Sequence, residues 1–147
     1  MKALSVHPYY AMAIVSGQKS IEVRSWATDY RGDILICSTA KKYHDTIPGH
    51  ALGVVTLEDV RQLEKKDCEA ALLLPKEYTQ HCLDYAWVLT NNRLIKPVPV
   101  KGKLSLWNYD GEIEFIPDNE WMLPPDASPE DTPPGEWYHK YWEPLLF

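Results

Sequence analysis

The sequence has few cysteines and no long apolar run. Its 147 residues include three cysteines, Cys37, Cys68 and Cys82, and no C-x-x-C pair. An odd number of widely spaced cysteines argues against a disulfide framework and favours a reducing compartment. No apolar run approaches the roughly 18 residues that a membrane-spanning helix needs, and residues 1–7 contain no signal-like apolar segment. We therefore expect a cytoplasmic protein with no membrane association.

Motifs for metals and cofactors are also missing. His81 and Cys82 are the only adjacent His and Cys residues, and a zinc site needs a larger cluster of ligands. The sequence has neither a glycine-rich phosphate loop nor the glycine-flanked serine of a nucleophile elbow. We expect no metal ion and no cofactor.

Charge is unevenly distributed along the chain, whose length favours one domain. Residues 1–109 carry a net charge of +3 and residues 110–147 a net charge of −9. The second stretch also contains seven of the twelve prolines and three of the six tryptophans. We expect a body at 1–109 and an acidic Pro- and Trp-rich extension at 110–147 that packs on it. A short helix is expected at 136–142, after a loose linker at 124–135.

The body has the pattern of an α+β protein with a small, partly closed barrel. Pro8 and Gly17 bracket an apolar run that predicts a buried helix. Residues 68–83 have helical composition broken at Pro75, and Asn91-Asn92 predicts a turn. Alternation and apolar runs predict five or six mostly antiparallel strands, near residues 2–6, 20–26, 34–37, 51–63, 85–90 and 104–107, the fifth running into the Asn91-Asn92 turn.

Three ionic residues stand out in the stretch SGQKSIEVRSW, residues 16–26. Lys19 follows the expected helix, and Glu22 and Arg24 share one face of the next strand, with the apolar residues directed inward. Glu22 can fix Arg24 through charge-assisted hydrogen bonds, and the arginine fork suits phosphate. The three side chains either line a ligand site or form an ordinary ion pair on a solvated strand face, which contributes little.

These residues resemble the ASCH domain, a branch of the PUA-like superfamily with the signature G-x-K-x-x-E-x-R. Gly17, Lys19, Glu22 and Arg24 fit that signature, and the likeness extends over residues 2–109. Trp26, the Tyr30-Arg31-Gly32 turn and the pair Lys41-Lys42 add to it. The resemblance implies a PUA-like β-barrel that binds RNA, single-stranded nucleic acid or a nucleotide-like molecule in a cationic cleft bearing Lys19, Glu22 and Arg24.

Two other functions stay open. Small bacterial members of this family are N4-acetylcytidine amidohydrolases that use a Lys, a Thr and a distant Glu. Lys19 fits the first of these, whereas Glu22 occupies the Thr position. If the chain is such an enzyme, Lys19 and Glu22 are the catalytic candidates. The third possibility is a protein-interaction module of a transcription or translation regulator, for which no sequence feature identifies a partner.

Five further residues are candidates for the ligand site. Tyr9 and Trp26 could stack on a base, and they also suit core packing. His7 replaces a Gln common in the family, so it either faces the ligand or is a structural polar residue. Lys41 and Lys42 form either a phosphate clamp or a solvated loop. The acidic extension either occupies the cleft in place of RNA or covers an apolar face of the barrel.

Overall fold

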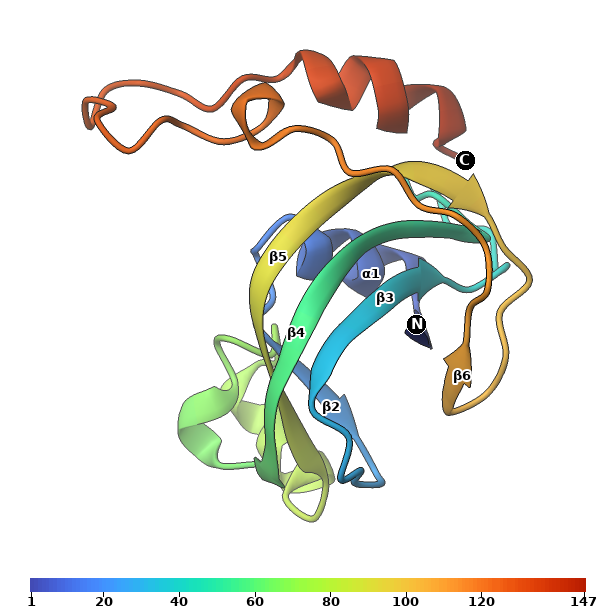
Figure 1. Ribbon diagram of the computed structural model, residues 1–147. Helices are drawn as coiled ribbons and strands as arrows, with labels where there is room; N and C mark the ends of the chain where they lie inside the picture. The colour runs from blue at the N-terminus through green and yellow to red at the C-terminus, as the bar shows by residue number, and fades with distance from the viewer.

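A single six-stranded sheet curls into a half-barrel (Figure 1). The computed structural model describes residues 1–147. Its strands lie in the order β2-β5-β4-β3-β1-β6, and only the β1–β3 pair is parallel. The α+β class and the mostly antiparallel half-barrel predicted from the sequence are thus confirmed. The strands are β1 (Lys2–Val6), β2 (Ile21–Arg24), β3 (Gly32–Ser38), β4 (His50–Gln62), β5 (Tyr85–Pro99) and β6 (Leu106–Asn108).

Apolar side chains cover both faces of this sheet. Along β3, Ile34 and Ile36 belong to the larger core cluster, and Leu35 and Cys37 belong to a second one, as expected from the alternation of a strand. The larger cluster is completed by helix α1 (Pro8–Val15), and the second by Trp107 of β6.

Helix α1 begins and ends where the sequence predicts. Pro8 occupies its first turn, and the Nδ1 atom of His7 accepts a hydrogen bond from the backbone N–H of Tyr9 (3.1 Å). Gly17, with φ of 87°, adopts the left-handed conformation just after the helix. The chain can therefore turn at once toward Lys19 and β2.

The turn predicted at Asn91-Asn92 is wrong, because β5 continues through both residues. Asn91 has φ of 51°, and the pairing with β4 shifts register between Val54 and Thr56. The asparagines thus lie in a β-bulge, which uses the same left-handed tendency of Asn as a turn does. The side-chain amide of Asn92 donates to the carbonyl of Val15 (3.0 Å) and ties the bulge to α1.

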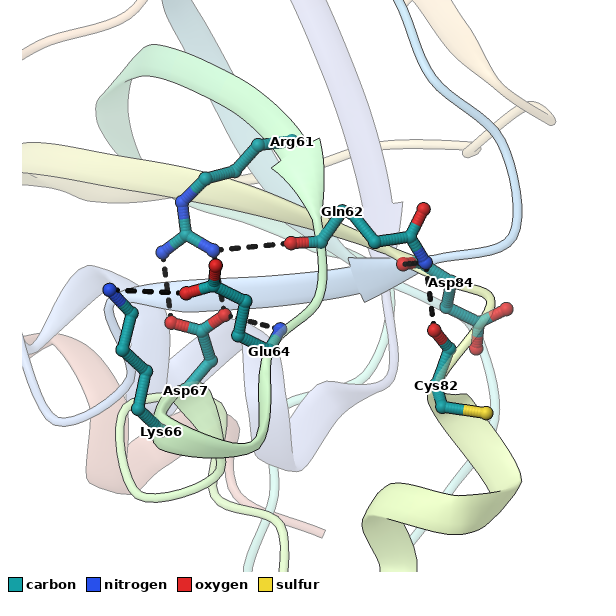
Figure 2. A network of polar contacts seen from close by, with 7 residues as sticks. All are labelled: Arg61, Gln62, Glu64, Lys66, Asp67, Cys82 and Asp84. Carbon is teal, nitrogen blue, oxygen red and sulfur yellow. Dashed lines mark hydrogen bonds and ion pairs between the residues drawn. The ribbon is translucent and has the colours of Figure 1, made fainter.

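Residues 63–84 form an insertion between β4 and β5, which lies beside β2 in Figure 1. Pro75 starts a helical turn in it, as a residue without a backbone N–H can. Figure 2 shows the polar network at its base, where Arg61 holds Asp67 through two hydrogen bonds (2.7 and 2.8 Å). The insertion contains η1 (Lys65–Asp67), η2 (Pro75–Glu77) and α2 (Tyr78–His81).

The acidic extension crosses one end of the half-barrel (Figure 1). Ile116 and Trp142 are buried in the larger core cluster. The short helix predicted at 136–142 is present, and residues 124–135 contain neither helix nor strand. No helix of the chain has the length and apolarity that crossing a bilayer requires. The helical segments are η3 (Asp118–Glu120), η4 (Tyr138–Trp142, a π-helix) and η5 (Glu143–Leu145).

Candidate ligand site at the open seam of the barrel

A cavity of about 510 Å³ lies where the curled sheet does not close. Strands β1 and β2 do not pair in the sheet order, and the Nη2 atom of Arg24 on β2 instead donates to the carbonyl of Ser5 on β1 (3.0 Å). Side chains of both strands, of α1 and of the 63–84 insertion line the cavity. Its lining includes Val6, His7, Tyr10, Lys19, Glu22, Arg24, Trp26, Ala71, Glu77 and His81.

Lys19 is buried at the inner end of this cavity, with 4% of the residue exposed. Its backbone N–H bonds to the carbonyl of Ala13, which fixes the turn after α1 (3.1 Å). Its ammonium donates to the carbonyl of Ala71 (2.5 Å) and lies 4.9 Å from the centre of the Tyr10 ring. A lysine is seldom buried without such partners.

Glu22 is the shared counter-ion of the two cations. Its Oε1 lies 3.7 Å from Lys19 Nζ, and its Oε2 lies 2.9 Å from Arg24 Nη2 and accepts from Arg24 Nε at 3.1 Å. The prediction that the charged residues of this strand face outward is wrong for Glu22, which is only 7% exposed. Because the sheet curls, the face that carries Glu22 turns toward the insertion and away from bulk water.

Arg24 retains hydrogen-bonding capacity that the protein does not use. Its Nε and Nη2 atoms are engaged by Glu22 and Ser5, whereas Nη1 has no protein partner. The side chain is 23% exposed and lines the cavity. Arg24 can therefore donate to a bound acceptor without breaking its bonds to the protein.

Burial lowers the pKa of Lys19 below its ordinary value of 10.5. The carboxylate of Glu22 opposes this shift by favouring the ammonium form, and the positive charge of Arg24 adds to it. Lys19 therefore loses its proton more readily than a solvated lysine does.

Aromatic rings surround these ionic groups. Trp26 lines the cavity and also packs edge-on against Trp87, with ring centres 4.8 Å apart, so it contributes to both the core and the site. The ring of His7 also borders the cavity and packs against Tyr43, with ring centres 4.2 Å apart.

The family model described as the ASCH domain matches residues 4–114. The chain belongs to the ASCH domain family. Over 139 residues it is 27% identical to human "Activating signal cointegrator 1", an alignment that covers 75% of this chain and 22% of that protein. This ASCH chain thus spans about a fifth of the length of that relative.

Solved structures of ASCH from Zymomonas mobilis share the fold. The unmodified protein has a TM-score of 0.53 at 23% identity, with 67% of this chain and 72% of that chain covered. Two single-residue variants of it give TM-scores of 0.51 and 0.54 at 24% and 23% identity. Each covers 67% of this chain, and 74% and 73% of its own. At this level of identity the likeness shows the fold alone.

Three of the candidate residues lie outside the ASCH cavity. Tyr9 is 56% exposed and borders a different hollow, with Tyr138 and Trp142 of the extension. Lys41 and Lys42 are exposed in the loop after β3, and Lys42 lies over the ring of Phe147. The structure thus brings together five of the eight candidates, His7, Lys19, Glu22, Arg24 and Trp26.

The insertion supplies site residues that sequence reasoning did not place there. Ala71 contributes only a backbone carbonyl, which no side-chain pattern reveals. Glu77 and His81 line the cavity, and His81 Nδ1 lies 2.8 Å from an oxygen of Asp84. The sequence offered one signal for this part of the site: His81 and Asp84 are three residues apart beside a helical turn, a spacing that allows their side chains to pair.

The charge of the ASCH cavity is mixed. Two cations, Lys19 and Arg24, face two carboxylates, Glu22 and Glu77. No residue of the acidic extension lines it. A hollow of similar size, about 520 Å³, lies within the extension, and Asp118 is its one ionisable side chain.

Proposed function

We propose that this ASCH domain binds RNA or a nucleotide-like ligand whose base enters the cavity at the seam. The observation that carries the proposal is the group of buried Lys19 and Glu22 with partly exposed Arg24 in a recess bordered by aromatic rings. A volume of about 510 Å³ lies within the range of roughly 300–1,000 Å³ that is typical of small-molecule sites.

The chemistry of the recess suits a nucleobase. Glu22 offers acceptor oxygens and Arg24 Nη1 offers donors, which are the groups needed to pair with the polar edge of an unstacked base. Trp26 and Tyr10 present ring surfaces beside them, and stacking on an aromatic side chain contributes roughly 1–3 kcal/mol per base. Mixed charge is better suited to a base edge than to a phosphate alone.

Binding can be tested with a fluorescein-labelled single-stranded 12-nucleotide RNA. We expect the double variant Lys19→Ala, Arg24→Ala to bind at least ~10-fold more weakly, as the loss of one to two charged hydrogen bonds implies. The control Lys65→Ala, Lys66→Ala removes the same charge from the exposed edge of the insertion and should bind normally. If both variants lose the same RNA affinity, the loss reflects net charge alone and contradicts the proposal.

The lowered pKa of Lys19 favours a second candidate, hydrolysis of an acylated nucleoside such as N4-acetylcytidine. An unprotonated Lys19 could take a proton from water as that water attacks the acyl carbon, with Glu22 orienting it. Lys19 would return that proton to the N4 atom as the C–N bond breaks, which gives acetate and cytidine. Release of cytidine by the wild type that is lost in Lys19→Arg, which keeps the charge and cannot act as a base, supports this reaction.

A further inference from the structure

We infer that a second hollow of this chain binds the phosphates of the single-stranded RNA whose base occupies the cavity. This hollow, the lysine groove, lies between the loop after β3 and the loop from β5 to β6. Its volume is about 470 Å³. This inference rests on the proposed function. Its lining includes Ser5, Thr39, Lys101, Gly102, Lys103 and Leu104.

The lysine groove is cationic where the cavity is mixed. Lys101 and Lys103 line it, no carboxylate does, and both lysines are exposed and form no ion pair. Other exposed lysines, such as Lys65 and Lys76, are unpaired too, so the groove is distinguished by having two lysines on one hollow with no carboxylate in its lining. Unpaired lysines gathered on one hollow leave a positive potential for an anion to neutralise.

The groove adjoins the cavity at the edge of β1. The last residue pair between β1 and β6 is Leu4 with Leu106, so Ser5 lies just beyond the end of β6. Ser5 lines the groove, and its carbonyl accepts from Arg24, which lines the cavity. Ser5 thus contacts both, with its side chain at the groove and its carbonyl on Arg24, and in our proposal a nucleic acid strand leaving the cavity passes Arg24 toward the lysines.

The backbone around the groove is held in place. A Cβ atom on Gly102 would lie 2.5 Å from Ser5 Oγ, so the loop lies directly against β1, and a side chain there would require the Ser5 hydroxyl to shift. Gly49 joins the two loops, because it donates to the carbonyl of Thr39 (2.9 Å) and accepts from the N–H of Val100 (3.0 Å). The loop that carries the lysines is therefore anchored at Val100, just before Lys101, and by the contact of Gly102 with Ser5.

Stacking surfaces accompany the charges. Leu104 borders the groove and is 93% exposed, which is unusual for a large apolar side chain and suits contact with a ribose or base. Tyr43 is 39% exposed, follows Lys41 and Lys42, and packs on His7 at the border of the cavity. The groove itself thus offers apolar surface beside its lysines, and the aromatic surface on which single-stranded nucleic acid stacks lies at the cavity.

The test compares two RNA lengths on the full chain. The groove variant Lys101→Gln, Lys103→Gln should bind a 12-nucleotide single-stranded RNA ~25-fold more weakly at 0.1 M salt. The slope of log affinity against log salt should fall by about 1.4, because each phosphate that no longer meets a lysine accounts for ~0.7. Binding of a trinucleotide that fits the cavity should not change. The matched control Lys65→Gln, Lys66→Gln should leave the affinity for both RNAs, and its dependence on salt, unchanged.

The outcomes separate the groove from the cavity. If the groove variant binds the 12-nucleotide RNA with unchanged affinity and unchanged salt dependence, the proposal that the groove binds phosphates is wrong, whatever the result with the trinucleotide. If Lys19→Ala, Arg24→Ala does not affect the trinucleotide while the groove variant still weakens the longer RNA, the proposed function fails and the groove alone binds RNA. If the wild type does not bind the longer RNA, both are overturned.

Discussion

At the scale of single residues, Glu22 decides the properties of the site. It is the counter-ion of both cations, and the buried Lys19 would otherwise be held in a low-dielectric position without one. Its contact with Lys19 also opposes the effect of burial on that lysine. Burial therefore lowers the pKa of Lys19, and two neighbours of opposite sign, Glu22 and Arg24, modify that shift.

The titration of Lys19 should follow the charges beside it. Its folded pKa lies below the unfolded value of 10.5, so the unfolded chain binds more protons between these values and stability rises with pH in that window. We expect Glu22→Gln to lower the pKa of Lys19 further and Arg24→Gln to raise it. The measurement is a ¹³Cε NMR titration of labelled lysine, with the resonance assigned by its loss in Lys19→Arg. A Lys19 signal that titrates with the exposed lysines would contradict the described burial.

At the scale of elements, the insertion between β4 and β5 determines where the site's inner wall lies. Arg61 grips Asp67 at its base, the carbonyl of Asp67 accepts from the N–H of Ala71 (2.9 Å), and the carbonyl of Ala71 receives the ammonium of Lys19. Figure 2 shows the first part of this chain of contacts. The Arg61–Asp67 ion pair outside the cavity thus positions the carbonyl of Ala71 that binds Lys19 inside it.

Asp67→Asn should loosen the insertion. We expect it to reduce the free energy of unfolding by about 2 kcal/mol at pH 7, since hydrogen bonds between charged groups contribute roughly that amount. Arg61 holds the pKa of Asp67 below its ordinary 3.8, so the stabilisation is lost as the pH falls through that lowered value, and the two proteins should converge in strong acid. Urea unfolding at pH 7 and in acid checks this, together with hydrogen exchange at the Ala71 amide.

The exposed residue Asp59 provides the control for that measurement. It lies 3.7 Å from Arg31 in a solvated pair, and Asp59→Asn should change stability by less than ~0.5 kcal/mol. Equal losses in the two variants would mean that the clamp at Asp67 contributes no more than a surface pair.

How far the sequence predicts these elements depends on the physical signal that each one carries. Pro8 and Gly17 have backbone requirements of their own, and the helix between them lies as predicted. Asn91 signals a left-handed residue equally well in a turn and in a bulge, so the turn prediction failed. Period-two alternation predicts that Glu22 and Arg24 share one face of the strand. It does not predict that the sheet curls, which is what turns that face away from bulk water. The carbonyl of Ala71 has no side-chain signal at all.

At the scale of the whole molecule, the extension and the body share a core. Trp142 and Ile116 lie in the same apolar cluster as α1 and the sheet, although the sequence changes sharply in composition near residue 110. We propose that residues 110–147 belong to the same folding unit as residues 1–109 and that they stabilise the barrel by covering one of its faces.

Trp142→Ala should therefore destabilise the whole chain. We expect the free energy of unfolding to fall by about 4 kcal/mol, as for the truncation of other buried aromatic residues, with one cooperative transition for body and extension. Leu83→Ala, at a residue that is 84% exposed, is the control and should change stability by less than ~0.5 kcal/mol. If the body melts at the wild-type temperature in Trp142→Ala, the extension is a separate unit. Urea and thermal unfolding followed by tryptophan fluorescence and circular dichroism distinguish the two results.

Arg24 is bound at once to the glutamate of the site and to β1, the strand next to the opposite end of the sheet. The same guanidinium thus joins β2 to β1 and also lines the cavity, where it can contact a bound ligand. Lysine in its place would keep the positive charge, yet its single ammonium could not reproduce the planar fork that serves both tasks. A substitution of Arg24 that changes ligand specificity would therefore also weaken the contact between β2 and β1. Changes in specificity are then expected in the surrounding loops.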